Sequence, residues 1–235
     1  MAVDTLVIIP AYNEEAALPA VLAGLRARFP AFDLVVIDDG SADRTSEVAR
    51  AGGAAVVTLP FNLGVGGALR TGFRYAVRHG YQRAVQLDAD GQHDAGQVDA
   101  LLAALDGADL VIGSRFADGP GDYEVGRSRR LAMRFMQRGV RILSGRSFTD
   151  TSSGFRAFGP RSLDLFADQY PIDFLSDSVE ALLTALAAGL TVVEVPVHMN
   201  ERAGGVPSTR SLKLVYHYLR LLVVMTATAP RRSAR

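Results

Sequence analysis

The chain of 235 residues contains no cysteine. That absence excludes disulfide bonds, thiolate nucleophiles and thiolate zinc sites. The four histidines show no spacing that suits metal ligands: His79, His93, His198 and His217. Lys213 is the single lysine among 25 basic residues, so arginine carries almost all of the positive charge.

Long apolar runs are also missing. A helix that spans a bilayer needs about 20 apolar residues, and the run Leu221–Ala229 falls well short of that. The first residues lead directly into the apolar segment Thr5–Ile9, without the basic stretch and cleavage site of a signal peptide. The sequence therefore predicts neither a secretion signal nor a membrane-spanning helix.

The net charge is zero, but the two halves of the chain differ in sign. Residues 1–114 carry 8 arginines and 14 acidic residues, a net of −6, whereas residues 115–235 carry 17 basic and 11 acidic residues, a net of +6. The acidic half could hold a metal ion and the basic half an anionic ligand, although scattered solvated charge would give the same totals. With 49% hydrophobic residues and no linker-like stretch, residues 1–235 are expected to form one α/β domain.

Short apolar runs rich in β-branched residues predict six strands. They cover Thr5–Pro10, Asp33–Asp38, Ala54–Leu59, Ala84–Asp88, Asp109–Gly113 and Thr191–His198. Helical patterns cover Glu14–Phe29, Thr45–Ala51, Val65–His79, the segment from Asp94 to Leu105, Ser128–Leu143, Pro160–Ala167, Ser176–Ala188 and Ser208–Thr226. Asn13 is a suitable N-cap for the first helix, and Ser41 or Asp43 for the second. The alternation predicts a mostly parallel sheet flanked by helices, with ligands beyond the carboxyl ends of the strands.

Asp88-Ala89-Asp90 follows the fourth predicted strand. Two carboxylates one residue apart are rarely buried unless they are paired or bind a metal. In an extended chain, residues i and i+2 point the same way, so both carboxylates would face one cation. Oxygen ligands favour a hard ion such as Mg²⁺ or Mn²⁺, which often also binds substrate phosphates. The motif therefore predicts a metal–diphosphate site.

Two further motifs follow predicted strands. Asp38–Ser41 is consistent with turn chemistry, or with recognition of a base or ribose, because carboxylates accept hydrogen bonds from ring N–H and hydroxyl groups. Asn62–Ala68 is rich in glycine, but position 69 is Leu69 where a dinucleotide fingerprint requires glycine. We interpret its glycines as providing a tight turn and close packing of the next helix.

Arginines recur every three or four residues in the helical pattern after residue 126: Arg127, Arg130, Arg134, Arg138 and Arg141. A solvated helix face explains such a stripe in most proteins, and an interfacial helix that binds anionic headgroups is the alternative. No acidic residue lies between Ser128 and Ser147, which favours the interfacial helix. The last predicted helix, Leu212–Ala227, is apolar and amphipathic, and a basic tail follows it.

Seven segments, in this order, resemble family 2 glycosyltransferases of the GT-A fold, and within them the dolichyl-phosphate mannose synthase and polyprenyl-phosphate glycosyltransferase group. They are Val7–Glu15, Val36–Thr45, Asn62–Gly67, Gln86–Asp94, Gly113–Phe116, Ser153–Arg156 and Glu194–Val197. The resemblance implies a nucleotide-sugar-binding half over residues 1–114, an acceptor-side half over 115–210, and an amphipathic helix with a basic tail over 211–235.

The resemblance also implies roles for individual residues. The nucleotide site would be lined by Pro10, Tyr12, Glu14, Ile37, Asp39 and Ala89. Asp88, Asp90 and Gln92 would hold Mg²⁺ or Mn²⁺ on the donor diphosphate. Arg115 and Arg202 would lie near the donor phosphates, and Glu180 would be a site glutamate. The acceptor side would include Asp150, Ser153 and Arg156, together with Arg127, Arg130 and Arg134 of the arginine-rich helix.

The resulting hypothesis is a metal-dependent inverting transfer of a hexose from a nucleotide sugar, of GDP-mannose or UDP-glucose type, to polyprenyl phosphate. A phosphate acceptor is already anionic, whereas a sugar hydroxyl would need a base such as Asp177 or Glu180. The expected location is the cytoplasmic face of the cell membrane, as a peripheral protein, with a possible membrane-protein partner and no nucleic acid.

Two alternatives stay open. One is transfer to a hydroxyl group in envelope polysaccharide or glycoconjugate synthesis, and the other is a non-catalytic nucleotide-sugar-binding subunit of a membrane complex. Residues 202–210 lack the lysine that the dolichyl-phosphate group carries after its arginine. That departure leaves the donor, and the way its diphosphate is held, undetermined.

Overall fold

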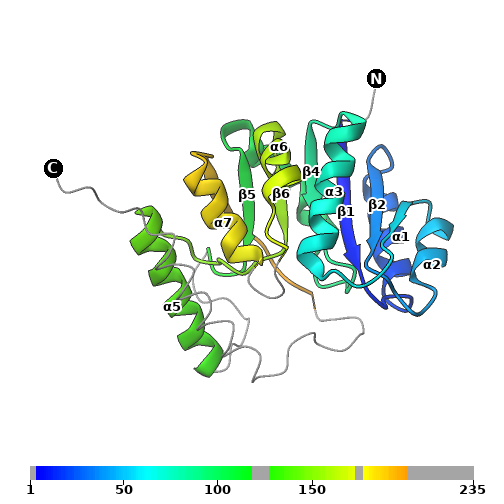
Figure 1. Ribbon diagram of the computed structural model, residues 1–235, viewed down its shortest axis with the longest axis horizontal. Coiled ribbons are helices and arrows are strands. Elements are labelled where there is room, and N and C mark those ends of the chain that lie inside the picture. Colours follow the sequence, from blue (N-terminus) through cyan, green and yellow to red (C-terminus); the bar gives the residue numbers. More distant parts are fainter. Residues whose placement is uncertain (1–3, 118–126, 173–176, 201–235) are drawn as a thin grey trace.

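The computed structural model describes residues 4–117, 127–172 and 177–200. Their central sheet has seven strands in the order β3-β2-β1-β4-β6-β5-β7. The strands are β1 Thr5–Ala11, β2 Asp33–Asp38, β3 Ala55–Thr58, β4 Arg83–Gln86, β5 Leu110–Ser114, β6 Arg156–Phe158 and β7 Val192–Pro196. The pairs β1–β2, β1–β4, β2–β3 and β5–β7 are parallel, while β6 runs antiparallel to both β4 and β5. The prediction of a mostly parallel sheet flanked by helices is confirmed (Figure 1).

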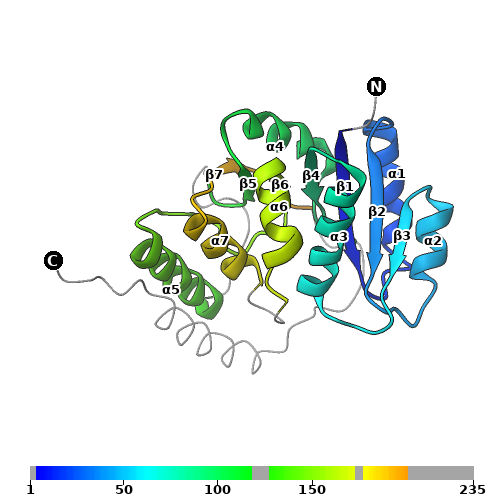
Figure 2. The ribbon, with the colours of Figure 1, turned by 45° about the horizontal axis from the view of Figure 1, so that its top comes forward.

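Helices cover both faces of the sheet (Figure 2). They are α1 Leu18–Arg28, α2 Thr45–Ala51, α3 Val65–His79, α4 Val98–Ala104, α5 Arg127–Ser144, α6 Pro160–Gln169 and α7 Asp177–Ala187, with short 3₁₀ turns at Ala95–Gln97 and Leu105–Gly107. Alternate residues of β1 face opposite sides. Ile8 packs in the core with α3, α6 and α7, whereas Ile9 packs in the core with α1, α2 and α4. Burial on both faces explains why these strands are continuous apolar runs.

Several predicted boundaries are wrong. The strand β4 ends at Gln86, two residues before the predicted end at Asp88. Helix α1 begins at Leu18, because Asn13 has a positive φ of 56° and its Oδ1 accepts a hydrogen bond from the Ala42 N–H instead of capping the helix. The sequence analysis also missed β6, whose three residues include an arginine and form no apolar run. The predicted C-terminal helix lies outside the described residues.

Gly72 of α3 marks the closest approach of that helix to the sheet. A Cβ atom at this position would lie 2.4 Å from Cγ2 of Ile8, a fully buried strand residue that has little room to move. Gly24, on the exposed side of α1, has no heavy atom within 4 Å of the corresponding position. The same substitution is therefore expected to have opposite effects at the two sites.

We predict that Gly72→Ala lowers the free energy of unfolding by about 1–3 kcal/mol, since it overpacks the contact with Ile8. Gly24→Ala should raise it by roughly 0.5–1 kcal/mol, because alanine favours the helix without a clash. Urea denaturation followed by circular dichroism measures both changes. Equal stability of the two variants would contradict the packing described for α3.

Candidate functional site

The polar motifs of the chain gather where the parallel strands end. In the register of the sheet, Ala11 of β1 lies beside Asp38 of β2, and β4 is parallel to β1 on its other side. The carboxyl ends of these strands therefore share one edge, the lower edge in Figure 1. Parallel α/β sheets bind ligands at this edge.

The loop after β1 is held by the loop before α2. Three successive backbone N–H groups, those of Asn13, Glu14 and Glu15, donate to the side chains of Ser41, Thr45 and Asp43 at 2.9, 2.8 and 3.1 Å. Ser41 thus binds this loop and does not cap α2, while Asp43 accepts from the first N–H of α2, that of Thr45, at 2.9 Å. The result is a fixed loop in which the Tyr12 side chain is 48% exposed. Pro10 and Glu14, predicted to line a nucleotide site with Tyr12, flank it at the same edge.

Asp39 is buried and anchors the glycine-rich loop before α3. Its Oδ1 accepts from the Leu63 N–H at 2.7 Å and its Oδ2 from the Gly64 N–H at 2.8 Å. Burial raises the pKa of the Asp39 carboxyl, although these two N–H groups favour its charged form. A contact between Asp39 and a base stays a prediction. The side chain of Ile37 is fully buried in the core on the α3 side, so its predicted contact with the base would have to use its backbone.

Asp88 and Asp90 lie in a turn rather than on the strand. Gly91 has a φ of 78°, and Asp90 Oδ1 accepts from the Gln92 N–H at 3.0 Å. Strand alternation therefore does not point the two carboxylates the same way, contrary to the prediction. Asp90 is buried, Ala89 between them is buried, and the Asp88 side chain remains 39% exposed. Gln92 is partly buried, and its backbone carbonyl accepts from the Asn200 N–H at 2.8 Å.

Gly154 lies directly against the Asp88 carboxylate. A Cβ atom at Gly154 would lie 3.2 Å from Asp88 Oδ2 and 3.3 Å from Oδ1, so any larger residue there would press on this carboxylate. Within the described ranges, no cluster of three or more histidine, aspartate or glutamate side chains is arranged to hold a metal. Two carboxylates still suit Mg²⁺ or Mn²⁺, because such ions complete their coordination with water and substrate phosphates. The residues present therefore fit this metal.

Arg115 is held in place by Asp150. Its Nε lies 2.6 Å from Asp150 Oδ2 and its Nη2 lies 2.9 Å from Oδ1, a bidentate pair in which Asp150 is fully buried. Glu194 of β7 supports this pair, because it accepts from the backbone N–H groups of Thr149 at 2.8 Å and Asp150 at 2.7 Å. Asp150, predicted on the acceptor side, thus directly orients Arg115.

Two functional contacts escaped the sequence analysis. The role of Glu194 was missed, although an acidic residue inside an apolar strand was a usable signal. His93 was also given no role, although it lies close in sequence to Asp88 and Asp90, the acidic turn. Its Nδ1 accepts from the Asp88 N–H at 3.0 Å.

The other predicted acceptor residues differ in exposure. Arg156 is fully buried, and it donates from Nε to the Ser153 carbonyl and from Nη2 to the Ser178 carbonyl, both at 2.9 Å. It joins β6 to α7, while its Nη1 is buried without a hydrogen-bond partner in the described part of the chain, and its role on the acceptor side stays a prediction. Ser153 is also buried, and its Oγ accepts from the Phe155 N–H at 3.2 Å. Glu180 lies partly buried in α7, and Arg202 lies outside the described residues.

Helix α5 packs against α7 (Figure 1). Met136 and Val140 are buried, while Arg134, Arg138 and Arg141 are exposed beside the exposed apolar side chains of Phe135 and Ile142. The side chains of Arg127 and Arg130 lie outside the description, although both residues belong to the helix. Across the described parts of the chain, no helix has the length and apolar character needed to cross a membrane.

Residues 6–164 match the model of a protein family described as glycosyl transferase family 2. The undecaprenyl-phosphate mannosyltransferase of Micrococcus luteus is 36% identical, over 85% of this chain and 85% of its own length. The polyprenol monophosphomannose synthase of Mycolicibacterium smegmatis is also 36% identical, over 86% of this chain and 79% of its own length.

A solved structure of the Mycobacterium tuberculosis glucosyl-3-phosphoglycerate synthase superposes with a TM-score of 0.72 at 21% identity, over 97% of this chain and 81% of that one. The same synthase in complex with Mn²⁺ and UDP-glucose gives a TM-score of 0.69 at 22% identity, over 97% of this chain and 79% of that one. These likenesses show the fold. The family match and the relatives together show that this chain belongs to glycosyl transferase family 2 and is a glycosyltransferase with the GT-A fold.

Proposed function

We propose that the protein transfers a hexose from a nucleotide sugar to a polyprenyl phosphate, with Mg²⁺ or Mn²⁺, at the inner face of the cell membrane. The observation that carries this proposal is the acidic turn Asp88–Asp90, which lies at the carboxyl edge of the sheet with Gly154 against the Asp88 carboxylate. The relatives named for undecaprenyl phosphate and polyprenol support the lipid acceptor. A protein of the same fold, solved with Mn²⁺ and UDP-glucose, supports the metal.

On the donor side, Pro10, Tyr12, Glu14 and Asp39 are proposed to receive the nucleoside and Asp88, Asp90 and Gln92 to hold the cation. A bound Mg²⁺ or Mn²⁺ supplies positive charge to the diphosphate oxygens, where negative charge grows as the sugar–phosphate bond breaks. Arg115 adds a guanidinium whose direction is fixed by its bidentate pair with Asp150. A pre-oriented charge of this kind stabilises a leaving group without reorganisation during the reaction.

On the acceptor side, we propose an acceptor that is already charged. Asp150 is fully buried and bound by Arg115, so a hydroxyl acceptor would depend on Asp177 or Glu180 of α7 as the base. A polyprenyl phosphate presents an anionic oxygen and needs no such base. The phosphate oxygen attacks the anomeric carbon and forms the new carbon–oxygen bond, while the bond from that carbon to the nucleoside diphosphate breaks. Charge and atoms therefore balance without a proton acceptor.

The exposed side of α5 suits contact with an anionic membrane surface. Arg134, Arg138 and Arg141 would interact with lipid headgroups, while Phe135 and Ile142 could enter the interface. This placement would bring a lipid-linked acceptor to the enzyme by diffusion in the membrane. A membrane protein that receives the product remains part of the proposal.

A donor screen tests the reaction itself. Purified protein with Mn²⁺ or Mg²⁺, polyprenyl phosphate and either GDP-mannose or UDP-glucose should yield labelled sugar in the organic phase. The product should be acid-labile, as a sugar phosphate ester is. Transfer to sugar hydroxyls without any organic-phase product would contradict the lipid acceptor.

We predict that Asp90→Asn lowers the transfer rate by roughly 100-fold or more, the scale expected when a charge that stabilises the transition state is lost. The asparagine Oδ1 can still accept from the Gln92 N–H, so the turn should keep its shape. Asp99→Asn, on exposed α4, is the matched control for the same chemical change. Full activity of Asp90→Asn at limiting Mn²⁺ would remove the metal role.

Reversing the charges of Arg134, Arg138 and Arg141 to glutamate should weaken binding to vesicles that contain phosphatidylglycerol. Each arginine near an anionic surface contributes about 1 kcal/mol, so the triple variant should bind at least ~100-fold more weakly. Reversal of Arg28, Arg50 and Arg78, which are exposed on other helices, changes the net charge equally and serves as the control. Co-sedimentation with vesicles measures the difference. Equal loss in both triple variants would mean that α5 is not the contact surface.

A further inference from the structure

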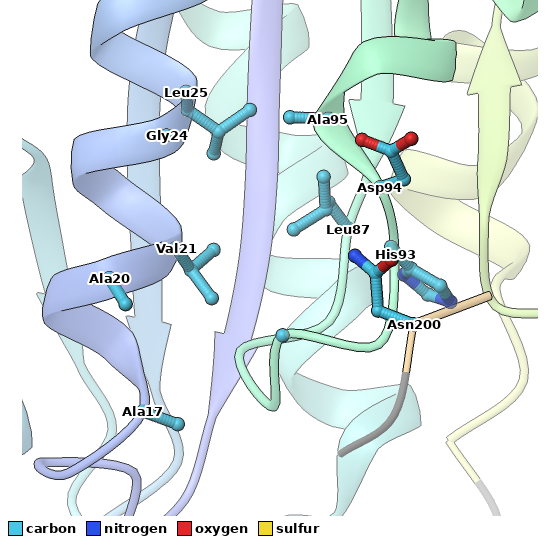
Figure 3. Close-up of a pocket in the computed structure, with 11 residues that line it drawn as sticks. Ala17, Ala20, Val21, Gly24, Leu25, Leu87, His93, Asp94, Ala95 and Asn200 are labelled. Atoms are coloured by element: carbon cyan, nitrogen blue, oxygen red, sulfur yellow. The ribbon is translucent and has the colours of Figure 1, made fainter. Parts of the chain in front are cut away.

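A buried imidazole lies behind the acidic turn. The side chain of His93 is 2% exposed, and its Nδ1 accepts a hydrogen bond from the Asp88 N–H at 3.0 Å. Figure 3 shows His93 on the segment that follows β4, across a pocket from α1. A fully buried polar side chain needs hydrogen-bond partners, and here the partner belongs to a proposed cation ligand.

The hydrogen bond at Nδ1 fixes where the ring carries its proton. Because Nδ1 accepts the backbone N–H, the neutral ring has its own hydrogen on Nε2. Nε2 lies 3.7 Å from Asp88 Oδ2, longer than a hydrogen bond but close enough for the N–H dipole to attract the carboxylate. One ring therefore contacts both the backbone and the carboxylate of Asp88.

The ring itself is held in a fixed position. It stacks on Phe155, with ring centroids 4.9 Å apart and planes at 13°. The backbone of His93 forms a bridge with Met199, so the segment after β7 fixes the turn from its other side. Phe155 directly follows Gly154, the residue that lies against the Asp88 carboxylate. The residue that supports the ring and the residue that contacts the carboxylate thus belong to the same short segment.

We propose that His93 is a positioning residue for Asp88: it fixes the backbone and the carboxylate direction of this residue and so tightens the binding of the divalent cation. The inference rests on the proposed role of Asp88 as a metal ligand. His93 touches neither the ion nor the donor. Groups that orient ligands in this way change metal affinity by about 10–100-fold in other proteins.

The test is the affinity for Mn²⁺ in the presence of GDP and, separately, UDP, with free Mn²⁺ measured by electron paramagnetic resonance. His93→Phe keeps the ring and its stacking on Phe155 but removes both nitrogens. Its dissociation constant for Mn²⁺ should rise ~10-fold or more. In the transfer assay the KM for Mn²⁺ should rise while kcat at saturating Mn²⁺ changes little, a split that a general loss of folded protein would not give.

Two further variants make the outcome decisive. His93→Asn can accept from the Asp88 N–H but cannot reach its carboxylate, so its Mn²⁺ affinity should fall between wild type and His93→Phe, and it replaces His93→Phe if that variant fails to fold. His79→Phe, which is exposed and stacks on Tyr75 at the end of α3, is the matched control and should bind Mn²⁺ as the wild type does.

Comparison with Asp88→Asn separates the two ideas. One outcome would overturn the role of His93 alone. In that outcome Asp88→Asn abolishes Mn²⁺ binding, whereas folded His93→Phe and His93→Asn bind Mn²⁺ within ~2-fold of the wild type. The proposed role predicts a change of at least ~10-fold. If the wild type shows no Mn²⁺ binding that depends on Asp88, the metal site fails and the inference fails with it.

Discussion

Hydrogen bonds from backbone N–H groups to carboxylates hold the loops at the functional edge of the sheet. Loops have no ladder partners there, so their N–H groups need other acceptors. Asp39 accepts from two such groups before α3, Asp90 accepts from one within its own turn, and Glu194 accepts from those of Thr149 and Asp150. Charged acceptors make these bonds stronger than neutral ones. Much of the acidic character of this edge therefore serves to fix the loops.

Asp88 and Arg115 are the two charged residues at this edge to which we assign a direct role in the reaction. The Asp88 side chain is 39% exposed, and its carboxylate lies against Gly154, where a larger residue would press on it. Arg115 is directed by a buried carboxylate that is itself supported from β7. Asp88 is thus held through its backbone, and the Arg115 side chain, which is 10% exposed, through its guanidinium. Transfer between two phosphates depends on such positioning and charge as the main contributions of the protein.

The sequence predicted the strands well because burial on both faces makes each one a continuous apolar run, as in Val7–Ile9 and Val35–Ile37. It failed where a structure depends on distant partners. Strand β6 contains the buried Arg156 and exists because β4 and β5 pair with it. Asn13 resembles a helix cap, yet it bonds to a loop 29 residues away.

The candidate site shows the same limit. The paired carboxylates located the acidic turn, and the resemblance to known glycosyltransferases located Arg115, because both belong to short local motifs. The supporting contact of Glu194 depends on the three-dimensional arrangement, since Glu194 lies 44 residues from its partner Asp150. His93 lies only 5 residues from Asp88, but its contact depends on the shape of the turn between them. Arg156, a motif residue assigned to the acceptor side, is buried and donates to the Ser153 and Ser178 carbonyls, so that assignment stays a prediction. A motif identifies a residue but does not give its surroundings.

The position of β6 has a consequence for synthesis on the ribosome. Strands β1 to β4 pair with one another as they emerge, but β5 pairs only with β6 and β7 in the described sheet, and these follow about 40 and 80 residues later. Until then, the fully buried side chains of Leu110, Val111 and Ile112 have no strand beside them. An unpaired apolar strand is a site of aggregation. During synthesis, folding of this chain should therefore pause after strands β1 to β4 have paired and before β5 is paired. A chaperone that covers residues 110–112 would act at that stage.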